Sequence, residues 1–157
     1  MLSALLPTLV ERFPCYSIVR NPLSVLGSWS SVNHNVRRGR SPAAERYDFR
    51  LSRRLEFIEN RVERQLHLLD WFFSQTARNL PDDHVVRYED MIATGGGALS
   101  VIDPDADRLY ESLESRNRNA AYDRNAMRTL GKQLLNSDGA YWHYYSKKSV
   151  KELLRGI

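Results

Sequence analysis

S-I-V-R-N-P-L-S-V-L-G-S-W, which runs from Ser17 to Trp29, is the stretch around which the rest of the chain is organised. The short run from Tyr16 to Val19 is apolar and β-branched and predicts a strand, which Arg20 closes. Asn21 directly before Pro22 is the order of a helix N-cap followed by the first helical residue. The stretch therefore predicts a strand, a tight turn and a helix.

The predicted turn is a candidate anion site. The first N–H groups of a helix lack partners within the helix and lie at the positive end of its dipole, so they hold anions readily. Arg20 adds a planar, permanently charged guanidinium suited to phosphate or sulfate, and Ser28 adds a hydroxyl two turns into the helix. An arginine here can equally pair with a nearby carboxylate, and the residues alone weigh the two alternatives about evenly.

The composition describes one soluble globular domain of 157 residues, with 42% hydrophobic and 27% charged residues. Lys and Arg outnumber Asp and Glu by 23 to 19, and the resulting net charge of +4 suits an anionic ligand, nucleic acid or an acidic surface equally.

Because Cys15 is the only cysteine, we expect no internal disulfide, no thiolate metal site and a reducing, cytoplasmic location. No apolar run reaches the ~20 residues of a membrane span, and the first residues lack a signal-peptide pattern.

Apolar periodicity predicts the remaining elements. We expect helices over 1–13, 51–80, 107–115, 122–135 and 147–155, a second strand over 84–88, and a turn at 95–97, where three glycines lack the lysine and hydroxyl of a Walker motif. A long helix between two strands predicts parallel pairing through a crossover connection. In such sheets ligands bind at the carboxyl ends of the strands, which is where Arg20 and Tyr88 fall.

Two further segments have alternative interpretations. Arg37, Arg38 and Arg40 cluster in a polar loop, which is either a basic lid over an anionic ligand or a solvated loop. The segment 137–146 carries five aromatic or imidazole rings, which either plug the end of the core or line a pocket for a flat ligand.

Three of these segments together resemble the sulfotransferase family, which uses 3'-phosphoadenosine 5'-phosphosulfate (PAPS) as sulfuryl donor. The turn at Arg20, with Ser28 eight residues later, is similar to the segment that binds the donor's 3'-phosphate in that family. R-Y-E-D at 87–90 resembles its strand-end motif, and the run 139–146 is similar to its Gly-x-Trp segment near the carboxyl terminus.

The resemblance implies specific roles. Arg20 and Ser28 would hold the 3'-phosphate, Tyr88 would approach the adenine, and Arg118, or Arg116, would supply the basic part of a loop that closes on the nucleotide. It also implies a helix-rich α/β fold with a short parallel sheet of the P-loop-like sulfotransferase type, as a single domain over 1–157.

Two parts of the family pattern do not occur in this sequence. The Gly-rich loop that wraps the 5'-phosphosulfate has no counterpart before Arg20, and no lysine or histidine precedes that residue. We therefore interpret the chain as N-terminally truncated, with its catalytic residues unassigned and no metal required. The family is one of enzymes, but the absent parts argue against catalysis by this chain alone.

The predicted partners are the nucleotide donor and an acceptor hydroxyl. A missing strand would leave an unpaired sheet edge, which favours a homodimer. Nucleic acid is not expected, because the arginines do not alternate with recognisable exposed aromatics in the sequence. The alternative function is a non-catalytic interaction module that places the basic loop at 37–40 on an acidic partner.

Overall fold

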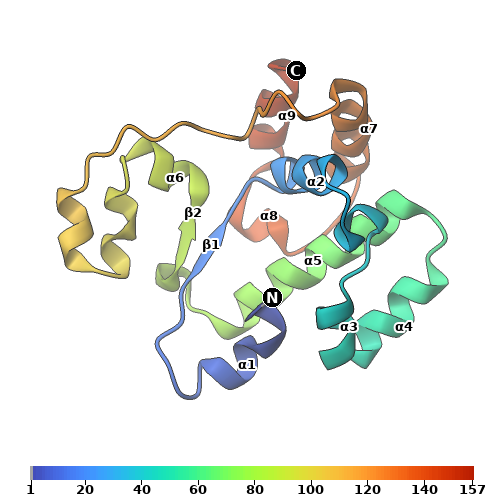
Figure 1. The fold of residues 1–157 in the computed structure, drawn as a ribbon, viewed down its shortest axis with the longest axis horizontal. Helices are drawn as coiled ribbons and strands as arrows, with labels where there is room; N and C mark the ends of the chain where they lie inside the picture. The colour runs from blue at the N-terminus through green and yellow to red at the C-terminus, as the bar shows by residue number, and fades with distance from the viewer. Residues whose placement is uncertain (1) are drawn as a thin grey trace.

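The structure is a computed structural model that describes residues 2–157. Figure 1 shows a short sheet beside a group of helices. In chain order the elements are η1 (Leu2–Leu5), α1 (Leu6–Leu9), β1 (Ser17–Val19), α2 (Pro22–Ser31), η2 (Asn35–Arg38), α3 (Pro42–Tyr47), α4 (Phe49–Phe57), α5 (Arg61–Asn79), η3 (Asp82–His84), β2 (Val85–Arg87), α6 (Tyr88–Ala93), η4 (Gly97–Val101), η5 (Pro104–Arg108), α7 (Arg124–Leu135), α8 (Tyr141–Tyr144) and α9 (Lys147–Arg155).

The sheet of the described residues consists of β1 and β2, which pair in parallel. Ser17 lies opposite Val85, and Val19 lies opposite Arg87. The predicted parallel pair across a long helical crossover is therefore confirmed, and the fold belongs to the α/β class in this coarse sense. Both strands end at the same edge, so the residues that follow them are brought together.

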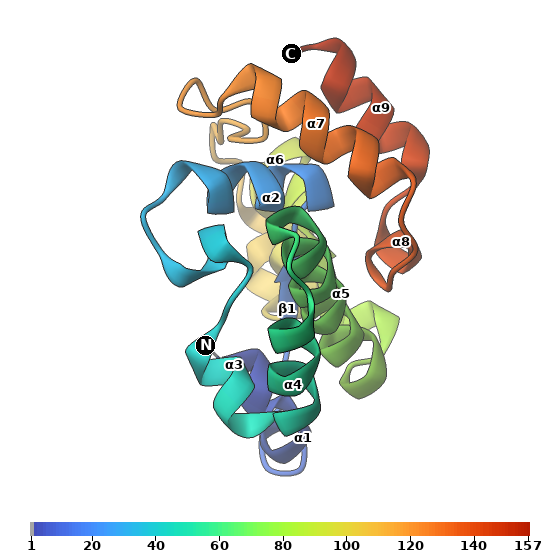
Figure 2. The ribbon, with the colours of Figure 1, turned by 90° about the vertical axis from the view of Figure 1, so that its right-hand side faces the viewer.

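The main core lies between α2, α5, α7 and the carboxyl-terminal helices, which surround one end of β1 (Figures 1 and 2). Asn21 caps α2, because its side chain accepts a hydrogen bond from Leu23 N, and Pro22 occupies the first turn as predicted. The buried core residues are Val19, Leu23, Leu26, Leu69, Phe73, Met127, Leu130, Leu134, Tyr141, Tyr145, Val150 and Leu153.

The aromatic segment near the carboxyl terminus plugs this core, which is the first of the two alternatives. Tyr141 is fully buried and meets Phe73 edge-on with the ring centroids 6.1 Å apart. The hydroxyl of Tyr141 lies 2.6 Å from Ser137 Oγ. Ser146 then caps α9 as predicted, accepting a hydrogen bond from Ser149 N.

The long helix predicted over 51–80 is two helices. The chain becomes extended at Ile58, and Asn60 starts α5 by accepting hydrogen bonds from Val62 N and Glu63 N. The apolar spacing continues across this break because Leu51 and Leu55 of α4 fold back against Leu68 of α5 and form a second small core. Periodicity alone therefore did not reveal the break, whereas the asparagine marks it.

Residues 95–115, here called the acidic arm, extend away from the helical body beyond β2 and α6 (Figure 1). Gly95 and Gly96 have φ angles of +59° and +102°, which only glycine adopts readily, and they turn the chain into the arm. The helix predicted over 107–115 is wrong: η5 ends at Arg108, and an isolated antiparallel bridge joins Tyr110 to Gly96.

The predicted first helix is also shorter than expected, since η1 and α1 together end at Leu9 and Met1 lies outside the described residues. Within 2–157, none of the helices combines the length and the apolar character that crossing a membrane requires.

Candidate functional site

Arg20 and Tyr88, the first residues after β1 and β2, meet at the carboxyl edge of the sheet. The guanidinium carbon of Arg20 lies 4.9 Å from the centroid of the Tyr88 ring. The Tyr88 hydroxyl accepts a hydrogen bond from Arg116 N (3.0 Å) and donates one to Glu114 O (3.4 Å). The last residues of the acidic arm and the segment that follows it are thereby tied to the end of β2, directly beside Arg20.

Arg20 is held by amide and carbonyl oxygens of this segment. Its Nε donates to Asn117 Oδ1 at 2.8 Å, and its Nη2 donates to the backbone oxygen of Arg116. These bonds use two of the five guanidinium N–H groups. Within 2–157 Arg20 has no carboxylate partner, so the sequence alternative in which Arg20 forms an ion pair is not what the fold contains. A positive charge with unused donors remains at the sheet edge.

Glu89 already supplies an anion to the turn between β1 and α2. Its Oε1 accepts hydrogen bonds from Asn21 N (3.1 Å) and Asn117 Nδ2 (2.6 Å). Its Oε2 accepts one from the Tyr145 hydroxyl (2.6 Å). Since Leu23 N is also bonded, to Asn21 Oδ1, the expectation of free N–H groups in this turn is corrected. An external anion would be met by the guanidinium of Arg20 rather than by the turn.

The Tyr145 hydroxyl anchors this network from the core side. It lies 3.0 Å from the Val19 backbone oxygen as well as beside Glu89. Burial, and then the hydrogen bond to the Glu89 carboxylate, raise the pKa of Tyr145 well above its ordinary value. Tyr145 therefore stays protonated and fixes the carboxylate that positions the turn carrying Arg20.

Ser28 lies on α2, half-buried, and no other described residue hydrogen-bonds to its hydroxyl. Ser24, one turn earlier on α2, donates to Asn117 O at 3.4 Å, so this side of the helix borders the segment that holds Arg20. Arg118 points elsewhere. Its Nη2 donates to Glu152 O in α9, and its guanidinium packs closely over Gly156.

The structure thus brings Arg20 and Tyr88 together, places Ser28 along the adjoining helix, and directs Arg118 toward the carboxyl terminus. Two groups that sequence reasoning missed complete the site. Glu89 could have been noticed because it lies inside the R-Y-E-D motif. Asn117 lies in an irregular segment, and no sequence pattern marks it.

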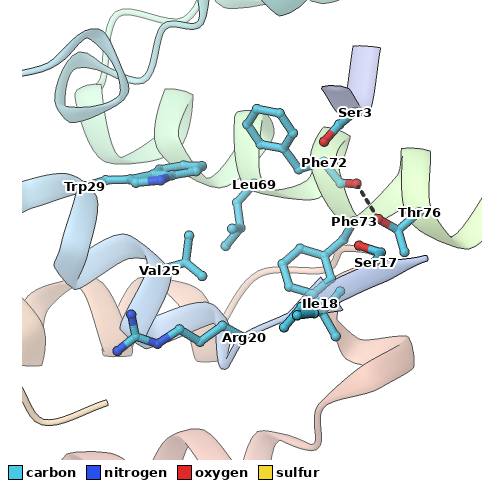
Figure 3. Close-up of a pocket in the computed structure, with 11 residues that line it drawn as sticks. Ser3, Ser17, Ile18, Arg20, Val25, Trp29, Leu69, Phe72, Phe73 and Thr76 are labelled. Carbon is cyan, nitrogen blue, oxygen red and sulfur yellow. Dashed lines mark hydrogen bonds between the residues drawn. The ribbon is translucent and has the colours of Figure 1, made fainter. Parts of the chain in front are cut away.

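A groove of about 270 Å³ runs beside β1 and is lined by residues of β1, α2 and α5 (Figure 3). Figure 3 shows Val25 and Trp29 from α2, and Leu69 and Phe72 from α5, around the space above the strand. Ile18, in the middle of β1, is 52% exposed and belongs to this lining. The lining is mostly apolar, with Arg20 at one end and the hydroxyl residues Ser3, Ser17 and Thr76 toward the other (Figure 3).

The loop with Arg37, Arg38 and Arg40 is less free than the sequence implied. Arg40 forms a salt bridge with Glu45, with Nη2 and Oε2 2.5 Å apart. Arg37 lines a second cavity of about 150 Å³ together with Arg61 and the serines at the end of α2. Among the described residues, no group of three or more His, Cys, Asp and Glu side chains is arranged to hold a metal ion.

No protein-family model, no curated protein and no solved structure matches this chain. The function is therefore inferred from the sequence motifs and from the geometry of the sheet edge.

Proposed function

We propose that this chain is a sulfotransferase-family domain that binds the adenosine 3'-phosphate end of PAPS. One observation carries the proposal. Separate motifs single out Arg20 and Tyr88, and the guanidinium carbon of Arg20 lies 4.9 Å from the centroid of the Tyr88 ring, at the carboxyl edge of a parallel strand pair. Ligands of such sheets bind at this edge. The geometry supports the proposal because a guanidinium with unused donors lies next to an aromatic ring.

Each residue of the site would contact a different part of the nucleotide. The unused N–H groups of Arg20 donate to the 3'-phosphate, where a planar guanidinium forms two parallel hydrogen bonds more readily than an ammonium does. Tyr88 offers its ring to the adenine. Ser28 adds a hydroxyl from α2, and Arg118 joins only if it leaves Glu152 O, to which it is bonded here.

The transfer step belongs to the same proposal. Sulfuryl transfer to an acceptor hydroxyl requires a group that takes the hydroxyl proton and positive charge that neutralises the leaving phosphate. The residues of this site hold the nucleotide end of the donor, so the groups that act on the sulfuryl remain to be assigned. A cytoplasmic location is a further part of this proposal, and a homodimer through the free edge of β1 is one of the two self-association modes that the oligomeric state of the chain distinguishes.

Calorimetric titration with adenosine 3',5'-bisphosphate tests the proposal. We expect micromolar affinity, about 8 kcal/mol of binding free energy, for the parent chain. Arg20→Ala should abolish binding, and Arg20→Lys should weaken it because the charge remains and the fork is lost. Arg46→Ala removes an exposed arginine of α3 far from the site and should bind like the parent.

Absence of binding by a parent chain that is folded by circular dichroism would contradict the proposal. Equal affinity of the parent and Arg20→Ala would contradict it too, because the nucleotide would then occupy another site.

The alternative is a non-catalytic interaction module, favoured by the cavity in which Arg37 and Arg61 lie together. Under that alternative, the parent chain should bind an acidic peptide, and the double variant Arg37→Ala/Arg61→Ala should not. Adenosine 3',5'-bisphosphate should not compete with the peptide for the parent chain.

A further inference from the structure

The acidic arm concentrates negative charge and apolar surface. Residues 95–115 contain five acidic side chains and a single arginine, a net charge of −4, whereas the rest of the chain carries 22 Lys and Arg against 14 Asp and Glu, a net charge of +8. Tyr110 is 94% exposed, and Val101, Ile102, Leu109 and Leu113 are exposed as well. Several exposed apolar side chains in one segment mark an interaction surface.

A second surface, on α3 and α4, has the opposite charge. Four arginines, Arg46, Arg50, Arg53 and Arg54, are exposed there, and within 2–157 none of them forms a salt bridge. We call this surface the basic face; exposed aromatic rings lie among its arginines, namely Tyr47, Phe49 and Phe57.

The helical spacing explains why these side chains share one side of α4. Leu51 and Leu55 face α5 and are buried, so positions 49, 53 and 57, which repeat every four residues, lie on the outer side. Asp48, the acidic residue between α3 and α4, is directed inward, where it accepts hydrogen bonds from Leu51 N and Trp71 Nε1. Apart from Glu56, which is exposed near the end of α4, the outer side is therefore basic and aromatic.

The two surfaces complement each other but lie at opposite ends of the molecule. In Figure 1 the acidic arm projects on one side and α3–α4 on the other, and in Figure 2 α3–α4 lies toward the viewer with the arm behind. Since the arm of one molecule cannot reach its own basic face in this structure, the contact requires two molecules.

We propose that the acidic arm of one copy of this chain docks on the basic face of a second copy. The acidic side chains of the arm face the arginines, and Tyr110 and its apolar neighbours cover the aromatic rings. Such a head-to-tail contact uses two different surfaces, so it leaves one of each free at the ends and extends to longer oligomers. It is independent of the nucleotide site and differs from a dimer through the edge of β1.

Two variants, each lacking one surface, test the proposal in the full chain. The arm variant is Asp105→Asn/Asp107→Asn/Tyr110→Ser, and the face variant is Arg50→Gln/Arg53→Gln/Phe57→Ser. All six side chains are exposed, so the variants should fold. A control that matches the face variant, Lys148→Gln/Lys151→Gln/Phe13→Ser, removes two positive charges and one exposed ring elsewhere.

Sedimentation velocity over a concentration series gives the readout. The parent and the control should show a mass that rises with concentration and falls at high salt, because electrostatic contacts are screened. Each variant alone should remain monomeric, with association weakened at least about tenfold. An equimolar mixture of the two variants should stop at a 1:1 dimer, since one intact arm and one intact face remain.

Three outcomes would overturn the proposal. The first is a parent chain that is monomeric at about 1 mM, where even weak association is visible. The second is an oligomer that survives both variants and is lost in Ile18→Lys, which would assign the contact to the edge of β1. The third is a monomeric parent that binds oligothymidylate through the basic face, since exposed rings among arginines also suit single-stranded nucleic acid.

Discussion

At the scale of single residues, Tyr145 links the core to the candidate site. Its ring belongs to the core, and its hydroxyl donates to Glu89, which holds Asn21 N in the turn after Arg20. Tyr145→Phe should lower the free energy of unfolding at pH 7 by about 1–2 kcal/mol, because a hydrogen bond to a charged group is lost. Urea unfolding followed by circular dichroism measures this difference.

The same residue predicts a pH dependence. Burial and the Glu89 carboxylate raise the pKa of Tyr145 in the folded chain, whereas in the unfolded chain it ionises near pH ~10. Its contribution to stability is thus full below pH ~10 and is lost as the pH rises further, by about 1.4 kcal/mol per pH unit, because the unfolded chain releases a proton that the folded chain keeps.

The gap in stability between the parent and Tyr145→Phe should therefore narrow above pH ~10. The raised pKa values of Tyr141 and Tyr144, which burial causes, affect both proteins and cancel in the comparison. Tyr110→Phe, at a fully solvated ring, is the matched control and should follow the parent at every pH. A gap that stays constant with pH would contradict the assignment.

At the scale of elements, Asp48 decides how α4 begins and where it packs. Its Oδ1 caps the helix through Leu51 N (3.0 Å), and its Oδ2 accepts a hydrogen bond from Trp71 Nε1 of α5 (2.8 Å). Partial burial opposes ionisation of Asp48, but these hydrogen bonds outweigh it and keep the pKa of this carboxyl below its usual range.

Asp48→Ala should reduce the free energy of unfolding by about 2 kcal/mol, since the helix loses its cap and the indole N–H loses its acceptor. Asp48→Asn keeps one acceptor oxygen, which can serve only one of these two N–H groups, and should therefore recover part of that loss. Asp83→Ala, at an exposed carboxylate before β2, serves as the control for urea unfolding. If Asp48→Ala is as stable as this control, Asp48 does not hold α4 against α5.

What the sequence could predict is clearest at this scale. The Asn21-Pro22 start of α2, the Ser146 cap of α9 and the parallel strands are short-range or periodic features, and the structure confirms them. The break between α4 and α5 was hidden, because the apolar residues of two helices that fold against each other keep the spacing of one helix. The acidic arm was missed because it has no apolar core to impose a period.

In the candidate site, too, local sequence features predict some residues, and only the tertiary fold reveals others. Arg20 and Tyr88 could be predicted to meet because each follows a strand of a parallel pair. Asn117 is 97 residues from Arg20 and lies in an irregular segment, so only the tertiary fold reveals that it holds the guanidinium. The direction of the Arg118 side chain, which donates a hydrogen bond to Glu152 O of α9, likewise depends on contacts between residues far apart in the chain.

At the scale of the whole molecule, the proposed nucleotide would join three segments that are far apart in the chain. The turn after β1, the end of β2 and the segment 114–117 are all hydrogen-bonded to one another around Arg20 and Glu89. A ligand held by them binds the folded state alone and stabilises the domain by linkage. At a concentration of about 100 times its dissociation constant, this amounts to about 2.7 kcal/mol.

Adenosine 3',5'-bisphosphate at that concentration should therefore raise the midpoint of thermal unfolding by about 5–10 °C for a domain of this size. Adenosine 5'-monophosphate, which lacks the 3'-phosphate, should shift it far less, and Arg20→Ala should respond to neither. Differential scanning calorimetry makes the comparison, with Arg46→Ala as the variant expected to match the parent. Equal shifts from the two nucleotides would show that the 3'-phosphate is not what Arg20 binds.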